Sequence, residues 1–580
     1  MARLMARRRS VTARSTARLS ATVLACVAAP LWLRAQAADS TTHCDGERIS
    51  AIDVVRSERV AIDRAHTPGF LRAVLKPLLY GAPTRAEAIT PYLQLHVGGT
   101  CTALARTESE RLLRRLPYLA DARVTTTSDG SGGVRVTVET TDDLRPVIGL
   151  GVKGSQFNDL ELGSTSIGGS GQLAALRWRD GGAFRDYLGA RYTHYHLLGG
   201  PNLAQFAIAR TPLGSFTSVS VQRPFLTDLQ RVAGFGGYLK DDGYLEFARR
   251  DGEPLSLRTA RERVDGGFAA RLATHGVGSW LAGALVMHEQ RSSGDDAVRI
   301  TDRGLLDTTA VELRQRYPNT SITRAGIVLG ARALTFVKAT AFDGLESVQD
   351  VGRGIQLSTV FGRGISGDHA PFLAGDLYTG VGTARNFIGL RVQAEARRDG
   401  AGWGNEVLSG RLAWYSRPSA RQTRVVTVEY AGASVDSIPF QLPIADGTTG
   451  MRGYSGSRLS GGQRVIARAE RRFLFPGLGK AFGWGAAGFV DAGQMWKGRV
   501  PFGESAFRSS AGLSLLAAVP RASRSVARVD VGYPLVKDPH AKGVDVRVSY
   551  SVAARAFWRE PAALARVRVM NPTADIFSWP

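Results

Sequence analysis

The chain has 580 residues, of which 67 are glycine, and 44% of its residues are hydrophobic. This length exceeds that of a typical single domain, and the supply of apolar residues excludes a chain that is disordered throughout. The formal net charge is +23, and seven arginines within the first 38 residues contribute to it, which leaves about +16 for the remainder.

The first 37 residues have the pattern of an export signal. Six arginines between Arg3 and Arg18 precede an apolar run, Leu19–Leu33, and Ala35–Ala37 provides small residues for cleavage. A membrane anchor, the alternative, requires about twenty apolar residues, and this run is shorter. We therefore expect residues 1–37 to be removed on export. An exported basic chain rarely meets nucleic acid, so we expect no nucleic-acid partner and consider anionic lipid or solvent for its charged surface.

Two cysteines, Cys44 and Cys101, follow the signal. In an oxidising compartment two such thiols can pair, and no third ligand surrounds them at the spacing of a metal site. We therefore predict a disulfide between Cys44 and Cys101.

Residues 44–142 are predicted to form a compact α+β domain. The pattern Thr107-x-x-Glu110 is a capping box, which predicts a helix that starts there and ends at Pro117. Alternating apolar residues on both sides of a glycine-rich turn predict a hairpin. The other expected elements are a strand at Ile49–Val55, a helix-like stretch at Thr84–Leu95, and hairpin strands at Ala122–Thr127 and Val134–Val138.

The sequence from Leu93 to Thr125, followed by the strand V-R-V-T-V-E-T-T-D, resembles a POTRA domain, the polypeptide-transport-associated module. The resemblance implies a periplasmic location and a surface to which extended client chains can add as strands. It also leaves room for accessory periplasmic proteins as partners.

From Pro146 to Ser551, strand-like runs recur without a helix, and nineteen can be counted. In the clearest runs, Leu390–Arg397, Val526–Val531 and Val544–Tyr550, apolar and polar residues alternate. No stretch after residue 40 has eighteen consecutive apolar residues, as a membrane-spanning helix would require. Strands closed into a barrel can also cross a membrane. A soluble sandwich or propeller shows the same alternation, so the pattern alone leaves these alternatives open.

No motif in the chain supports an enzyme. Gly149-x-Gly151-x-x-Gly154 matches a dinucleotide fingerprint in letters, but no helical pattern follows it. His194 and His196 would share one face of a strand, but no third ligand is placed to complete a metal site. The common nucleophile, phosphate-loop and zinc-protease motifs do not occur. We therefore predict no catalytic residue, no cofactor and no metal site.

A glycine-rich stretch starts at Gly450 and runs into a strand. Met451-Arg-Gly-Tyr454, the later A-E-R-R around Glu470, and F-V-D-A-G around Asp491 resemble the signature of the BamA/TamA superfamily, which are outer-membrane assembly and transport barrels. The resemblance implies that this loop, the sixth extracellular one, folds back into the lumen. Arg452, followed by Gly453 and Tyr454, is then the anchor of the loop on the barrel wall. Asp491 is its main carboxylate partner and Glu470 a second.

Alternation along the strand that contains Asp491 supports the same geometry. If Asp491 points inward, small residues such as Gly483 and Gly485 point inward with it, while Trp484 and Val490 point outward. The small inner residues leave room for a loop, which is why we prefer Asp491 to Glu470. Five strands can be counted after the loop, as a sixteen-stranded barrel of the superfamily requires.

The resemblance thus implies a transmembrane β-barrel of about 16 antiparallel strands at residues 146–552. One small periplasmic α+β POTRA-like domain, residues 44–142, precedes the barrel, and a C-terminal extension, residues 553–580, follows it. Barrels of the superfamily end on an aromatic residue, so Phe557 or Trp558 is expected to end the last strand.

The implied function is assembly and insertion of outer-membrane proteins, or protein translocation. Unfolded outer-membrane or secreted clients would be received by the POTRA domain and inserted or passed at the seam between the first and last strands, near 147–153 and 543–552. Two alternatives are a dedicated two-partner-type secretion pore, and a surface antigen or passive porin without insertase activity.

Overall fold

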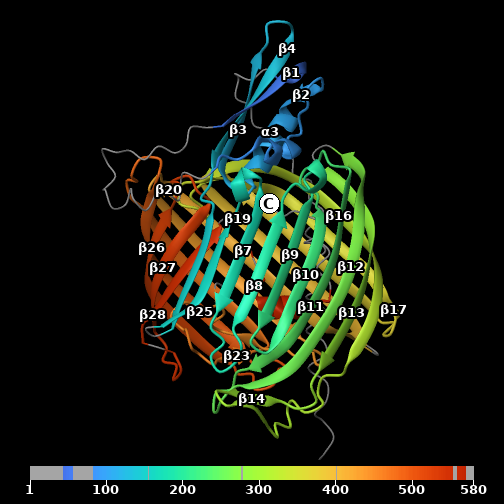
Figure 1. The fold of residues 1–580 in the computed structure, drawn as a ribbon, viewed down its shortest axis with the longest axis vertical. Coiled ribbons are helices and arrows are strands. Elements are labelled where there is room, and N and C mark those ends of the chain that lie inside the picture. Colours follow the sequence, from blue (N-terminus) through green and yellow to red (C-terminus); the bar gives the residue numbers. More distant parts are fainter. Residues whose placement is uncertain are drawn as a thin grey trace, which may run out of the picture. The chain divides into compact units, whose positions relative to one another are not determined.

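The structure is a computed structural model that describes residues 44–56, 82–153, 156–275, 278–399, 402–447, 449–541, 543–552, 558 and 560–569. The expected export signal, residues 1–37, lies outside the described residues. The described chain forms a four-stranded sheet and a closed antiparallel barrel (Figure 1). Within these ranges, no helix has both the length and the apolar character needed to cross a membrane.

The four-stranded sheet has the order β2-β1-β4-β3, in which β1 pairs with β4 in parallel and the other pairs are antiparallel. Helix α3 and the sheet enclose an apolar core that includes Leu112, Leu113, Val124 and Val136. The elements are β1 (Asp45–Arg56), the 3-10 helices η2 (Ala86–Ala88) and η3 (Thr90–Tyr92), β2 (Thr100–Thr102), α3 (Ala103–Arg114), β3 (Leu119–Ser128) and β4 (Gly133–Asp142). The predicted strand and hairpin are confirmed.

The predicted start of helix α3 was wrong. The N-cap is Thr102, whose hydroxyl accepts a hydrogen bond from the N–H of Ala105 at 3.2 Å. Thr107 lies one turn inside the helix, where its hydroxyl donates to the carbonyl of Ala103 at 2.8 Å. Glu110 accepts from the N–H of Val124 on β3 instead of completing a cap. A cap one turn earlier, together with tertiary contacts of Glu110, thus overrode the capping-box pattern.

Twenty strands of the described chain form the barrel wall, which closes between β28 and β5. They are β5 (Pro146–Lys153), β6 (Gln156–Ser164), β7 (Gln172–Arg179), β8 (Tyr187–His194), β9 (Leu203–Thr211), β10 (Gly214–Arg223), β11 (Val232–Phe247), β12 (Leu255–His275), β13 (Gly278–Ser293), β16 (Thr320–Thr340), β17 (Val348–Ser366), β18 (Pro371–Gly382), β19 (Asn386–Asp399), β20 (Gly402–Ser419), β21 (Gln422–Ser434), β24 (Gln463–Leu474), β25 (Gly483–Trp496), β26 (Ala506–Ala518), β27 (Ser525–Pro534) and β28 (Asp545–Val552). Strands β14 (Val298–Thr301) and β15 (Gly304–Asp307) form a hairpin within a loop.

The barrel fold is confirmed, but the predicted number of about 16 strands was wrong. The five strands expected after the glycine-rich loop are β24 to β28, while fifteen wall strands precede the loop instead of eleven. The nineteen runs counted from alternation were closer to the wall of twenty. The value of sixteen came from the family resemblance, and the alternation of the earlier strands did not support it.

Side chains alternate between the lumen and the outer face of the wall. On β25, Phe489 and Asp491 are buried toward the lumen, and Trp484 and Val490 are exposed on the outer face. Exposed large apolar residues continue around the wall, for example Leu408 on β20 and Leu513 on β26. A continuous apolar outer face around a polar interior is typical of a barrel in contact with lipid.

The two ends of the barrel differ in what they contact. We call the end at which β5 begins the proximal rim, and the opposite end the distal rim. The small domain packs on turns of the proximal rim: Tyr118 meets Tyr195 edge to face, with ring centroids 5.8 Å apart. Arg524 donates to the carbonyl oxygen of Leu116 at 2.7 Å.

The chain continues beyond the last wall strand, which ends at Val552. Trp558 is buried but belongs to no strand, so the expectation that it ends the last strand was wrong; Phe557 lies outside the described residues. Residues 560–569, which include helix α4 (Ala562–Val567), contact lumen-facing residues of the wall. We call residues 560–569 the lumenal segment.

Candidate functional site

The loop between β21 and β24, residues 435–462, folds from the distal rim into the lumen. Its two arms pair through β22 (Leu442–Pro443) and β23 (Ser460–Gly461). Apolar side chains of the loop are buried together with two wall residues, and the cluster comprises Ile444, Met451, Tyr454, Leu459, Ile466 and Met495. This apolar cluster holds a glycine-rich segment in one position.

Met451 of the loop packs against a glycine of the wall. It is fully buried, and its Sδ occupies the space that a Cβ at position 493 would need. The facing residue on β25 is Gly493, which has no Cβ. The long side chain of the loop therefore fits against a glycine of the wall.

Arg452 binds the wall through three of its side-chain nitrogens. Its Nε and Nη2 donate to the two oxygens of Asp491 at 2.9 and 2.6 Å, and Nη1 donates to Glu470 at 3.0 Å. The guanidinium also lies over the ring of Phe489, 3.5 Å from its centroid. The Asp491 side chain has no exposed surface. A buried arginine that donates two hydrogen bonds to one carboxylate forms one of the stronger kinds of ion pair.

Glu470 connects Arg452 to two further arginines. It accepts hydrogen bonds from Arg472 at 2.6 Å and from Arg528 on β27 at 2.6 and 3.1 Å. Arg528 also donates to Asp530 at 2.6 Å. The six charges of this group sum to zero, and we call it the Arg452 cluster: Arg452, Arg472, Arg528, Glu470, Asp491 and Asp530.

Sequence reasoning placed Arg452, Asp491 and Glu470 together, and the structure has all three in contact. It missed Arg528 and Asp530. These two residues occupy alternate positions of β27, and the apolar Val529 and Val531 alternate with them toward the outer face. Charged residues on the inner face of a wall strand were the signal that could have identified both.

Gly453 and Tyr454 fix the loop tip against the strands that end the barrel. The N–H of Gly453 donates to Asp545, the first residue of β28, at 2.9 Å. Gly453 has φ +84°, a conformation that favours glycine. The Tyr454 hydroxyl donates to the carbonyl oxygens of Ser509 and Val536, each 2.8 Å away. The loop thus contacts β28, the strand at the barrel closure.

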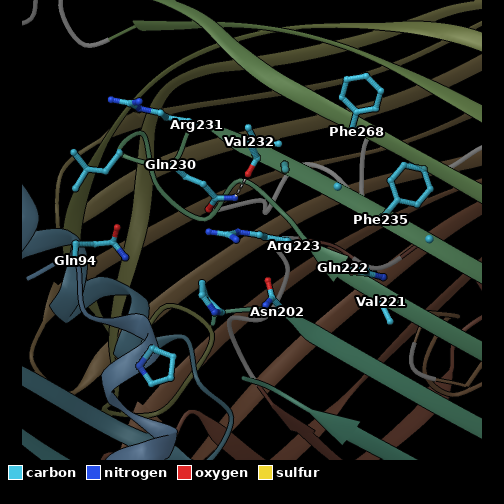
Figure 2. A pocket seen from close by; sticks show the side chains of 16 residues that line it. Gln94, Asn202, Val221, Gln222, Arg223, Gln230, Arg231, Val232, Phe235 and Phe268 are labelled. Carbon is cyan, nitrogen blue, oxygen red and sulfur yellow. Dashed lines mark hydrogen bonds between the residues drawn. The ribbon is translucent and has the colours of Figure 1, made fainter. Parts of the chain in front are cut away.

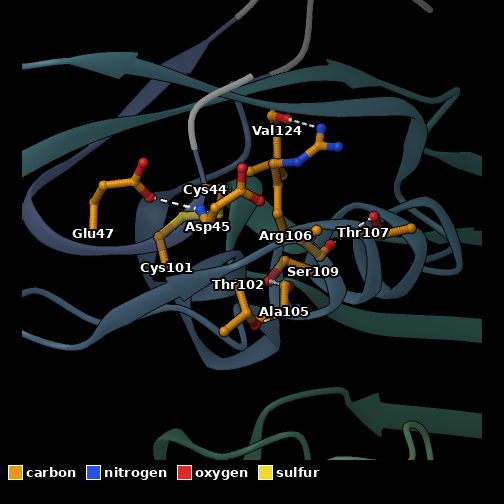
Figure 3. Close-up of a disulfide and its surroundings, with 11 residues drawn as sticks. Cys44, Asp45, Glu47, Cys101, Thr102, Ala105, Arg106, Thr107, Ser109 and Val124 are labelled. Carbon is orange, nitrogen blue, oxygen red and sulfur yellow. Dashed lines mark hydrogen bonds between the residues drawn. A yellow bond between two sulfur atoms is a disulfide. The ribbon is translucent and has the colours of Figure 1, made fainter. Parts of the chain in front are cut away.

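Two residue pairs from the sequence analysis lie outside this cluster: the two cysteines after the signal, and the two histidines of β8 and the turn that follows it. Cys44, directly before β1, and Cys101 of β2 form a disulfide and are 57 positions apart in the sequence (Figure 3). A closed loop of this length corresponds to about 4 kcal/mol in the chain-entropy model. His194 and His196 stack edge to face with ring centroids 4.6 Å apart. Across the described ranges, no three His, Cys, Asp or Glu side chains are grouped to hold a metal ion.

A cavity of about 920 Å³ opens beside the proximal rim, between the small domain and the turn from β10 to β11 (Figure 2). Gln94 lines it from the small domain, and Arg223 and Arg231 line it from the barrel. None of its described lining residues is an Asp, Glu, His, Lys, Tyr or Cys.

Residues 424–553 match the model of the Omp85 superfamily domain. This range runs from β21 through β28 and contains the loop and the whole Arg452 cluster. Among curated proteins, none matches the chain.

Three solved structures are similar at low identity. The first is BamA from Haemophilus ducreyi lacking POTRA domains 1–3, with a TM-score of 0.38 and 12% identity over 87% of this chain and 84% of that one. CdiB from Escherichia coli gives a TM-score of 0.39 and 11% identity over 90% and 92%. CdiB from Acinetobacter baumannii gives 0.35 and 10% over 87% and 73%.

Proposed function

We propose that this chain, whose residues 424–553 form an Omp85 superfamily domain, assembles or translocates unfolded protein clients at the bacterial outer membrane. The observation that carries the proposal is the Arg452 cluster, which ties the lumen loop to β24, β25 and β27, while the neighbouring Gly453 binds Asp545 on the last strand. Such a cluster fixes the position of a loop and performs no covalent chemistry. The proposed mechanism therefore makes and breaks no bond.

The closure between β28 and β5 is the proposed site of client passage or insertion. Both strands have eight residues, whereas β12 and β16 have 21 each. Because ladder hydrogen bonds scale with strand length, a pair of eight-residue strands opens at a lower cost than a long pair. The loop tip holds β28 directly: Asp545 accepts from Gly453, and Arg547 donates to the carbonyl of Met451 at 3.1 Å.

The small domain is the proposed receiving surface, where an extended client adds a strand to the sheet. Side chains of α3 already cover part of the edge strand β3. Arg106 donates to the carbonyl of Val124 at 3.2 Å, and Glu110 accepts from its N–H at 3.0 Å. Such covering protects an edge from unwanted pairing. We therefore assign client pairing to the end of β3 toward Ser128.

We place the barrel in outer-membrane lipid, with the proximal rim and the small domain on the periplasmic side. The apolar outer face supports contact with lipid. The short turns of the proximal rim, which the small domain covers, support a periplasmic orientation of that rim. Accessory periplasmic proteins would then reach the small domain from the same side.

A passive porin is disfavoured because the lumen holds both the loop and the lumenal segment. A dedicated two-partner-type secretion pore stays the second candidate, since a filled lumen that empties for one partner fits it equally well.

Depletion of the protein, followed by quantification of the outer-membrane and secreted proteomes, separates these roles. Broad loss of barrels supports assembly, and loss of one secreted protein supports dedicated secretion.

Complementation of the depleted strain links the role to the site. We expect the Arg452→Ala variant to restore the proteome poorly and Arg471→Ala, an exposed arginine of the neighbouring strand β24, to restore it fully. An unchanged proteome after depletion would contradict both client-handling roles.

A further inference from the structure

The lumenal segment occupies a defined site on the inner wall, which we call its seat. Leu564 and Val567 of helix α4 are completely buried. They pack in one cluster with Val407 of β20, with Ala431 and Ala433 of β21, and with four apolar residues of the loop 435–462. The other face of the helix, with Ala562, Ala565 and Arg566, is exposed within the lumen. The helix therefore presents an apolar pair three residues apart to a matching apolar patch of the wall.

Arg568, directly after the helix, makes the polar part of the seat. Its Nε donates to both oxygens of Glu560 at 2.8 Å. Its Nη2 donates to the Ser409 hydroxyl at 2.9 Å and to the carbonyl of Gln393 at 3.2 Å. The Ser409 hydroxyl in turn donates to Glu560 at 2.6 Å. The side chain of Arg568 is 5% exposed, so its charge is buried and paired.

The wall also binds the backbone at the end of the helix. Arg261 of β12 donates to the carbonyl oxygens of Arg566 and Arg568, each at 3.0 Å. Glu395 of β19 accepts from the N–H of Val569 at 3.1 Å. The last carbonyls of a helix have no partner within it, and here a wall arginine satisfies two carbonyls at that end. These contacts do not depend on the side chains of the segment.

The helix itself supplies little of this stability. It has six residues, and its N-cap, Pro561, makes no side-chain capping hydrogen bond. Isolated helices of this length are unstable in water. Wall contacts therefore hold the segment. Another segment would gain the same contacts if it carried the same apolar pair, the arginine, and an acid at the position of Glu560, which belongs to the segment itself and pairs with Arg568.

We propose that this inner wall, with the adjoining part of the loop 435–462, is a recognition site for a short helical segment of a client protein with the pattern Glu-x-x-x-Leu-x-x-Val-Arg. The chain's own lumenal segment occupies the site in this structure and yields it to the client. Displacement frees the lumen and releases the residues that follow β28 from the opposite wall. The inference rests on the proposed role of the barrel in handling clients.

A buried reporter tests whether the seat is occupied and exchangeable. Ala431→Cys in the full-length protein, purified in lipid nanodiscs, places a thiol beneath Leu564 and Val567. We expect slow reaction with a charged maleimide in this background. Adding Leu564→Asp should raise the rate at least tenfold, because a carboxylate cannot stay in the apolar patch. Adding Ala565→Asp, on the exposed face, should leave the rate unchanged.

The exchange is tested with a synthetic peptide of residues 558–569 added to the Leu564→Asp variant. We expect the peptide to restore slow labelling of the thiol. Peptides that carry Leu564→Asp or Arg568→Ala should protect at least tenfold less well. Equal labelling of all variants would show that the segment is not seated, and failure of the peptide to protect would show that the site does not accept a segment in trans. Either result overturns the inference, whatever the depletion experiment shows for client handling.

Discussion

Arg114 of α3 and Asp350 of β17 form a two-pronged ion pair that joins the small domain to the barrel. Nε and Nη2 of the arginine donate to the two carboxylate oxygens at 2.8 and 2.6 Å. The two side chains are 3% and 9% exposed. Lys338 of β16 pairs with Glu110 beside it. The position of the small domain on the proximal rim therefore depends on a few buried charges.

We expect Asp350→Ala to loosen the small domain. Asp350 binds two nitrogens of Arg114, and its removal leaves the buried guanidinium with Glu110 as its carboxylate partner, so we expect a cost below the about 3 to 5 kcal/mol of a buried charge left without any partner. Limited proteolysis should then release residues of the small domain faster, while the barrel stays intact on gels. Asp53→Ala is the matched control, because its pair with Arg135 is about half exposed and exposed pairs contribute about 0 to 1 kcal/mol. Equal proteolysis of both variants would contradict the assigned role.

Acid should weaken the same interface through Glu110. Burial by itself raises the pKa of Glu110, but hydrogen bonds from Lys338 and Val124 and the charge of Arg114 lower this pKa to about 2. Since the folded pKa lies below the ordinary value of 4.5 for a glutamate, the stabilisation is complete above about pH 4.5 and is lost as the pH falls toward 2.

Thermal unfolding of the small domain, followed between pH 5 and 2.5, measures this loss. Glu110→Gln should have lower stability at pH 5 and a flatter pH profile. Asp143, whose burial raises its pKa to about 6, acts in the opposite direction, because a raised carboxyl pKa adds stability as the pH falls below 6, and it does so equally in both variants. If the Glu110→Gln variant loses as much stability as the wild type over this pH range, Glu110 is not the source of the loss.

The Arg452 cluster should respond to mutation as one unit. We expect Arg452→Ala and Asp491→Ala each to lower barrel stability by about 3 to 5 kcal/mol, and the double variant to cost less than the sum. Arg452→Lys should not restore stability, because an ammonium group cannot hold both oxygens of Asp491 and Glu470 together. Heat-dependent gel migration reports barrel unfolding. Strictly additive losses would show that the two residues act independently.

Gly493→Ala tests the packing of the loop against the wall. The added Cβ would overlap Sδ of Met451, so we expect a loss of about 1 to 3 kcal/mol from overpacking. Met451→Val should recover most of this loss in the double variant, because it shortens the conflicting side chain. Gly488→Ala, whose Cβ would meet its nearest neighbour at 4.0 Å, is the neutral control on the same strand. The prediction fails if both alanines have equal effects.

Local patterns in the sequence predicted what depends on local chemistry. Alternation identified β27 at Val526–Val531 and the inward face of β25, because side-chain polarity follows the lumen and the outer face at each position. Alternation could not predict the ion pair between Arg528 and Glu470. These residues are 58 positions apart and meet only when their strands come together around the lumen. The lumenal segment was missed for a related reason: Leu564 and Val567 have helical spacing, but their partners on β20 and β21 lie more than 130 positions earlier.

The position of the lumenal segment in the chain separates closure of the wall from filling of the lumen. Residues 560–569 follow β28, so the last strand of the wall is complete before the segment begins. A chain interrupted before Glu560 would keep every wall strand and the loop 435–462, but the apolar residues of β20 and β21 that pack on Leu564 and Val567 would lose that cover.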